Sequence, residues 1–301
     1  MRLIQSTRSI ASWTVYPATV VGAFVITAAL LSTGLPILPA SYAAVVIAAG
    51  AVTLFEFVIP YDKAWQPLWT DVKNDLLFMV AVQMVLPQLL GLLLALTLLG
   101  YLEPLDLPLS DLWPRTLPLF FQVALMLVVA ELLRYPLHVA AHNTKTLWRL
   151  HAVHHSPKKL YWLNVGRFHP VEKALQYSLD TVPFILIGVG AEAVALYFVF
   201  YAVNGFYQHS NVDVRYGLLN YLVSGPELHR WHHSKLVDES NRNYGNNLIV
   251  WDLVFGTWFL PRSVRVGDLG LKNRDYPLDF LGQMTAPLTP GLDKKPPSKG
   301  S

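Results

Sequence analysis

The sequence contains no cysteine among its 301 residues, and charged side chains make up only 14% of it. The absence of cysteine excludes disulfides, thiolate zinc sites, cysteine-ligated iron–sulfur clusters and cysteine nucleophiles. The charges sum to a net +3, which is too small to indicate nucleic-acid binding. Apolar side chains make up 53% of the chain, a balance typical of a membrane protein rather than of a soluble domain.

Several catalytic motifs are also missing. The sequence has no H-E-x-x-H of a zinc peptidase, no G-x-S-x-G of a serine hydrolase, and no glutamate three residues before any histidine, as carboxylate di-iron bundles have. No G-x-G-x-x-G follows a strand pattern, so the chain itself is not expected to bind a dinucleotide. A haem-binding helical bundle stays an alternative, although most histidines lie beyond the ends of the apolar segments.

Four apolar stretches are about long enough to cross a hydrocarbon core of about 30 Å, which takes roughly 20 helical residues. They lie near Ala18–Leu38, Tyr42–Ile59, Leu76–Leu99 and Leu117–Leu137. A fifth apolar region, Tyr177–Phe206, is interrupted by two glycines and a glutamate, which fits a hairpin of half-helices that dips into the membrane. Lysine and arginine gather before the first segment, after the second and after His138, which places these parts on the cytoplasmic side. We predict an all-α polytopic membrane protein with about four transmembrane helices, this hairpin and a cytoplasmic histidine-rich helical cap.

All ten histidines lie between residues 138 and 233. They form three clusters at helical spacing and two single residues: His138 and His142; His151, His154 and His155; His229, His232 and His233; and, singly, His169 and His209. Residues i, i+3 and i+4 of a helix have Cβ atoms about 5–6 Å apart, so their imidazoles can converge on an ion held at about 2.0–2.1 Å. The three clusters together predict a metal site.

The number of histidines indicates two metal ions, because one ion takes only about four to six ligands. Imidazole suits zinc, copper, iron and nickel alike, so the ligand type does not select the metal. His169 precedes Pro170, where a structural role or a hydrogen bond to another ligand is as compatible with the sequence as ligation. For His209, at the end of the predicted hairpin, ligation is favoured.

Histidine ligands usually donate their second ring N–H to a carboxylate or carbonyl group. The candidate carboxylates are Glu131, Glu172, Asp213, Asp238 and Asp252. Glu131 and Arg134 lie near the cytoplasmic end of the fourth apolar segment, where charge is costly, so both are expected to face the protein interior. We expect these two side chains to pair with each other, with binding of a polar lipid head as the alternative.

With these motifs the chain resembles the fatty acid hydroxylase/sterol desaturase superfamily. The resemblance spans about residues 117–261 and is carried by the three clusters, by Arg167-Phe168-His169-Pro170-Val171-Glu172, by His209-Ser210-Asn211, and by Asn243-Tyr244-Gly245 leading to Trp251–Thr257. The Arg167 element is most similar to the bacterial sterol-desaturase-like or alkylglycerol monooxygenase-like branch. One departure is Gly205, where some members have a further histidine, so a ten-ligand set would need His169.

The resemblance implies an oxidoreductase that uses O₂ and two iron ions, ligated by the ten histidines, to oxidise an unactivated C–H bond of a membrane lipid or sterol-like substrate. Hydroxylation is expected, desaturation at the same site is the alternative, and a non-catalytic metal carrier or sensor is the alternative from another class. Zinc can replace iron in an isolated sample. Electrons are expected from a separate protein or a diffusible reductant, and the oligomeric state stays open.

The resemblance also divides the chain. Residues 1–116 are expected to form an N-terminal transmembrane anchor, residues 117–262 the catalytic domain, and residues 263–301 a C-terminal segment that is disordered from about Gln283. The active site is expected on the cytoplasmic face of a bacterial inner membrane, or of the endoplasmic reticulum membrane in a eukaryote.

Overall fold

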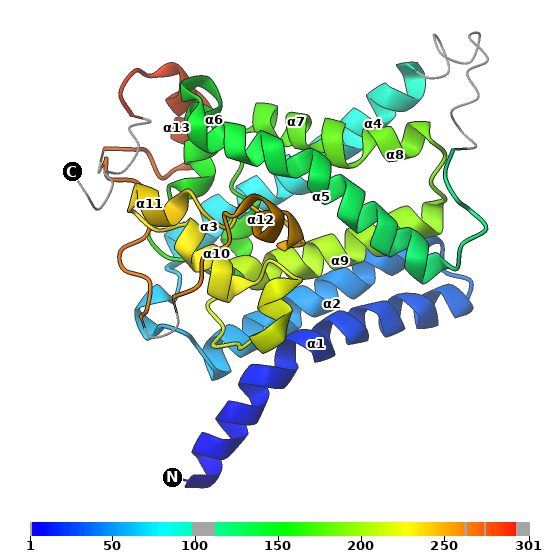
Figure 1. The fold of residues 1–301 in the computed structure, drawn as a ribbon, viewed down its shortest axis with the longest axis horizontal. Helices are drawn as coiled ribbons and strands as arrows, with labels where there is room; N and C mark the ends of the chain where they lie inside the picture. The colour runs from blue at the N-terminus through cyan, green and yellow to red at the C-terminus, as the bar shows by residue number, and fades with distance from the viewer. Residues whose placement is uncertain (1, 98–111, 262–263, 274, 293–301) are drawn as a thin grey trace.

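The computed structural model describes residues 2–97, 112–261, 264–273 and 275–292 (Figure 1). In these ranges the chain is helical apart from its loops and three isolated β-bridges. The predicted all-α class is therefore confirmed.

Among the described residues, four helices are long and apolar enough to cross a membrane. They are residues Ile10–Ser32 of α1 (Arg2–Ser32), α2 (Ile37–Val58), the continuous helix Trp69–Thr97, and α5 (Leu119–Asn143). The third consists of α3 (Trp69–Phe78), the π-helix η2 (Met79–Val85) and α4 (Leu86–Thr97). The four candidate spans agree with the predicted number and fit a polytopic helical membrane protein.

The first predicted span is displaced toward the C-terminus relative to the observed helix. Gly34 has φ +86°, a conformation that favours glycine, and it ends the helix instead of lying within it. The residues from Ile37 onward already belong to α2. The predicted end of the third span, Leu99, lies outside the described residues.

The second half of the chain consists of shorter helices. They are α6 (Lys145–His155), η6 (Trp162–Gly166), α7 (Pro170–Asp180), α8 (Val182–Leu186), α9 (Ala191–His209), η7 (Gly217–Tyr221), α10 (Pro226–His232), α11 (Val237–Ser240) and α12 (Val250–Phe255). The predicted interruption of the fifth apolar region lies between α8 and α9, where Gly188 has φ +84°.

The N-terminal and histidine-bearing halves share one core. Val15 of α1, Val52 of α2 and Val203 and Tyr207 of α9 are buried in the same hydrophobic cluster. Figure 1 shows these three helices side by side. Helix α9, which belongs to the predicted catalytic domain, therefore packs directly against helices of the predicted N-terminal anchor.

The C-terminal segment is ordered further than predicted. Gln283 lies in α13 (Phe280–Thr285), is fully buried, and donates a hydrogen bond of 2.7 Å from Nε2 to Ser156 Oγ. Helix η8 (Ala286–Leu288) follows, and Ala286 packs in a cluster with Trp148. The prediction of disorder from Gln283 is thus wrong at its start, because these contacts outweigh the proline-rich composition; residues 293–301 lie outside the described residues.

Candidate metal centre

Nine of the ten histidines gather in two groups. Within each group one ring nitrogen per histidine lies within 4.8 Å of the others. The five-histidine group consists of His138, His142, His151, His155 and His232, and the four-histidine group of His154, His209, His229 and His233. Every one of these rings is buried except His138, which is half-buried. The groups come from α5, α6, α9 and α10, so four separate helices must pack together to form them.

Each HxxHH motif divides its histidines between the two groups. The two histidines four residues apart belong to the same group, and the histidine between them belongs to the other group. His151 and His155 are in the five-histidine group and His154 is in the four-histidine group, whereas His229 and His233 are in the four-histidine group and His232 is in the five-histidine group. Successive residues on an α-helix point about 100° apart, so neighbouring histidines cannot face the same ion. Helices α6 and α10 thereby each supply both groups, and the rings of His155 and His233 stack at 4.4 Å between them.

In six of the grouped histidines, the ring nitrogen Nδ1 forms a hydrogen bond to an oxygen atom of a residue outside the two groups. The partners are Tyr244 O for His138 (2.6 Å), Asn241 Oδ1 for His142 (3.1 Å), Glu172 Oε1 for His151 (2.6 Å), Arg167 O for His154 (3.2 Å), Asn164 Oδ1 for His209 (2.8 Å) and Arg242 O for His232 (2.8 Å). Each partner is an oxygen that accepts, so we infer that each Nδ1 carries the hydrogen. This leaves Nε2 with a free lone pair that points into the group.

The inward ring nitrogens fit metal ions. His138 Nε2 and His151 Nε2 lie 3.1 Å apart, and with both hydrogens on Nδ1 two lone pairs face each other at that distance. The Nε2 atoms of His142, His209 and His232 are buried without a hydrogen-bond partner in the described part of the chain. Buried polar atoms are rarely left unpaired, and a cation between these nitrogens would satisfy them.

Burial also keeps these imidazoles neutral. It lowers the pKa of His155 and His233 well below the usual value, and repulsion from His233 lowers that of His155 further, as repulsion from His229 does for His233. The pKa of His232 falls to about 3, first because of burial and then because of His151. Neutral imidazole is the form that ligates metals, so the site is prepared for metal at physiological pH.

Two of the predicted carboxylates hold the loop that contacts His138. Asp252 accepts hydrogen bonds from the backbone N–H groups of Tyr244 (2.8 Å) and Gly245 (2.7 Å), and the carbonyl of Tyr244 faces His138 Nδ1. Glu131 accepts from the next three backbone N–H groups, those of Asn246, Asn247 and Leu248. Both therefore act on the ring of His138 through the backbone, whereas Glu172 contacts His151 directly.

The other two candidate carboxylates, Asp213 and Asp238, are not among the six Nδ1 partners of the grouped histidines. The backbone N–H of Asp213 donates to Ile59 O (2.8 Å), and Asp238 lies in the first turn of α11. The ring acceptors that the sequence analysis did not name are the amides of Asn164 and Asn241 and three backbone carbonyls. A backbone carbonyl has no signature in the sequence, and Asn164 and Asn241 lie 45 and 99 residues from the histidines that they contact.

The structure places His169 outside both groups. Its Nδ1 accepts a hydrogen bond of 3.3 Å from the backbone N–H of Val171, and its Nε2 lies 3.2 Å from Met284 O. His169 therefore caps the N-terminus of α7, with Pro170 at the first helical position.

The predicted pair between Glu131 and Arg134 does not form. Arg134 instead forms a buried salt bridge with Asp180 and donates to Asn246 Oδ1 (3.2 Å). The sequence distance of three residues permits the pair, but the carboxylate of Glu131 is already satisfied by backbone N–H groups from residues 246–248. The loop that binds Glu131 lies more than one hundred residues away in the sequence, so the residues around Glu131 do not predict this contact.

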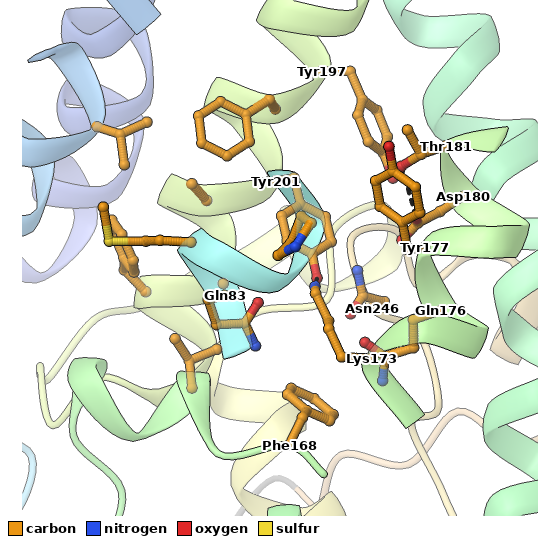
Figure 2. A pocket seen from close by; sticks show the side chains of 18 of the residues that line it. Gln83, Phe168, Lys173, Gln176, Tyr177, Asp180, Thr181, Tyr197, Tyr201 and Asn246 are labelled. Carbon is orange, nitrogen blue, oxygen red and sulfur yellow. Dashed lines mark hydrogen bonds between the residues drawn. The ribbon is translucent and has the colours of Figure 1, made fainter. Parts of the chain in front are cut away.

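A cavity of about 950 Å³ adjoins both histidine groups. Figure 2 shows part of its wall, with Phe168, Lys173 and Tyr201 among the labelled side chains. His138 and His151 of one group and His154, His209 and His229 of the other line it. The remaining wall is mainly apolar and comes from α2, η2, α7 and α9. Gly205, one turn before His209, lines this cavity without a side chain. The fold and site together define a helical membrane protein with a buried, histidine-rich centre beside a cavity large enough for part of a lipid.

Comparison with known proteins identifies the family. Residues 123–257 match the family model named fatty acid hydroxylase. The chain is 36% identical over 242 residues to the ornithine lipid hydroxylase OlsE of Rhizobium tropici, covering 79% of this chain and 72% of that protein. The chain therefore belongs to the fatty acid hydroxylase family, as the sequence motifs predicted, and is an oxidoreductase of membrane lipid metabolism.

More distant relatives cover only part of the chain. An alkylglycerol monooxygenase of Danio rerio is 30% identical over 132 residues, which is 44% of this chain and 29% of that protein. A putative Delta(7)-sterol-C5(6)-desaturase 2 of Arabidopsis thaliana is 28% identical over 147 residues, which is 47% of this chain and 50% of that protein. No solved structure matches the chain.

Proposed function

We propose that this protein hydroxylates an unactivated C–H bond of a membrane lipid, with O₂ as co-substrate and two iron ions held by the two histidine groups. The observation that carries the proposal is the convergence of nine imidazoles, eight buried and one half-buried, on two points beside a largely apolar cavity. Hydroxylation is favoured over desaturation because a relative that covers 79% of this chain is a hydroxylase. The desaturase relative keeps desaturation as the second candidate.

The proposed ligands are the nine grouped histidines, and His169 is not among them. Iron supplies the oxidising power, because an unactivated C–H bond offers no acidic proton that a side chain could remove. The chain itself orients the rings through their Nδ1 partners, positions the lipid in the cavity and excludes water with apolar walls. A separate protein or a diffusible reductant would supply the electrons.

We propose that the site lies on the cytoplasmic side of the membrane, because lysine and arginine gather in the histidine-bearing half of the chain. A bacterial inner membrane is the favoured location. Lys158 is exposed on the loop after α6. Since the chain has no cysteine, a Lys158→Cys variant can be labelled selectively. A membrane-impermeant thiol reagent should label it in inverted membrane vesicles and not in sealed right-side-out ones; labelling only in the latter would reverse the proposed orientation.

The activity test uses protein purified anaerobically in a mild detergent. It should hold two metal ions per chain by elemental analysis. The protein is then incubated with O₂, a reductant and a total lipid extract. A lipid product about 16 Da heavier than its precursor would show hydroxylation, and a product about 2 Da lighter would show desaturation. His229→Ala should abolish the product, whereas His169→Asn, outside both groups, should keep it. Two bound metals without any oxidised lipid would contradict the proposal and favour a metal carrier or sensor.

A further inference from the structure

Helix α7 carries its polar side chains inward. Glu172, Lys173, Gln176 and Asp180 are all buried, whereas Val171 on the opposite side is 52% exposed. Lys173, Gln176 and Asp180 are spaced three and four apart, so they lie on one helix face, and all three line the cavity (Figure 2). A helix next to lipid that turns its polar face into a cavity must find partners for that face there.

Lys173 is the charge in this stripe that lacks a counter-ion. Its ammonium donates one hydrogen bond, of 3.1 Å, to Tyr201 Oη and lies 5.1 Å from the centre of that ring. No salt bridge joins it to a carboxylate in the part of the chain that the structure describes. An ammonium group has three N–H donors, so two remain for a ligand.

None of the neighbouring carboxylates forms a salt bridge with Lys173 in the described residues. Arg134 and Asp180 form a salt bridge with each other, and Glu172 contacts the ring of His151 (2.6 Å). Gln176 Nε2 donates to Glu172 (3.0 Å), and Gln176 Oε1 is buried without a partner in the described residues. The cavity wall therefore offers an ammonium group without a salt bridge in the described residues and, one turn away, an unused amide acceptor. A buried charge is costly unless it is paired.

We propose that Lys173 binds an anionic oxygen group, a carboxylate or a phosphate, of the lipid substrate. This inference rests on the proposed function and narrows the substrate to a lipid whose head carries such a group. Glu172, the adjacent residue, contacts a histidine of the five-histidine group, so an anion at Lys173 is held close to that centre. Lys173 would thus be a specificity-determining residue that fixes which carbon of the lipid faces the metals.

The test measures binding without turnover. Metal-loaded protein in detergent is titrated, without O₂ or reductant, with oleate, oleyl phosphate and oleyl alcohol, which share one chain and differ in the head. We expect the wild type to bind oleate or oleyl phosphate about 10-fold or more tightly than the alcohol, the effect of one charge-assisted hydrogen bond. The anion that binds more tightly identifies the head as carboxylate or phosphate.

Three variants assign the preference to the residue. Lys173→Met should bring the three affinities to within about 3-fold of one another, whereas Lys173→Arg should keep the preference for the anion. Lys145→Met removes an exposed lysine at the start of α6 and should behave like the wild type. Metal content is measured in each variant, and Lys173→Gln replaces Lys173→Met if the latter does not retain its metals.

Two results would overturn the inference: equal affinities in the wild type, or an anion preference that persists in Lys173→Met. Either result leaves the oxidation assay intact, so it would not count against the proposed hydroxylation. Conversely, a protein that binds the anions through Lys173 but never oxidises lipid would refute the proposed function alone.

Discussion

The carboxylate of Glu131 connects a membrane-spanning helix to the loop that positions His138. It accepts hydrogen bonds from the backbone N–H groups of Asn246 (2.5 Å), Asn247 (2.6 Å) and Leu248 (3.1 Å), and its side chain is only 2% exposed. The same loop includes Tyr244, whose carbonyl contacts His138 Nδ1 at 2.6 Å. Replacing Glu131 should therefore weaken both the fold and the retention of metal in the five-histidine group.

The size of the effect depends on how many backbone donors lose their acceptor. Leucine accepts none, so Glu131→Leu leaves three N–H groups buried and unpaired, at about 1–3 kcal/mol each. We expect the free energy of unfolding to fall by at least about 3 kcal/mol. Glutamine keeps one oxygen, which can still serve Asn247 and Leu248, so Glu131→Gln loses one bond and should cost about 1–3 kcal/mol.

Denaturant unfolding in detergent micelles measures these differences, and elemental analysis measures the metals. Glu192→Leu is the matched control, because Glu192 is exposed in the first turn of α9. We expect the wild type to be the most stable, Glu131→Gln to be less stable and Glu131→Leu to be the least stable. The metal content should decrease in the same order. A Glu131→Leu variant within about 1 kcal/mol of the wild type would refute the reasoning, as would equal losses for leucine and glutamine.

Three further predictions follow from the two groups. His155→Ala should remove a ligand of the five-histidine group and His154→Ala one of the four-histidine group, so iron Mössbauer spectra of the two variants should lose different components; identical spectra would contradict the division. In metal-free protein the free energy of unfolding should fall as the pH decreases from about 6.5 toward 3, by about 1.4 kcal/mol per pH unit for each buried histidine. The reason is that histidine in the unfolded chain binds a proton in this range, whereas folded His232, with its pKa of about 3, stays neutral. Denaturant titrations that do not change with pH would refute this prediction. His169→Ala should keep both metals and lose about 1 kcal/mol of stability, which His169→Asn restores as a cap; loss of one metal ion would instead show ligation.

Local sequence determined the parts of this protein that depend on neighbouring residues. Apolar length alone predicts the four spans, because the hydrocarbon core sets the number of helical residues needed. Histidines at helical spacing predict metal ligands wherever a helix forms, although the structure divides each HxxHH motif between two groups, and the order of the motifs indicates the family. The broken fifth segment is also local, since Gly188 adopts a backbone conformation that other residues avoid.

Only the tertiary structure decided which groups meet. The spacing of HxxHH cannot tell that His154 joins His209 while His155 joins His142, because this depends on how α6 packs against α5, α9 and α10. Glu131 lies three residues from Arg134, yet it binds a loop 115 to 117 residues away, and Arg134 binds Asp180. Burial likewise left Lys173 facing a cavity without a counter-ion, which its sequence neighbours do not reveal. The physical reason is that hydrogen bonds, ion pairs and metal ligation act over a few ångströms in space, and the fold alone sets those distances.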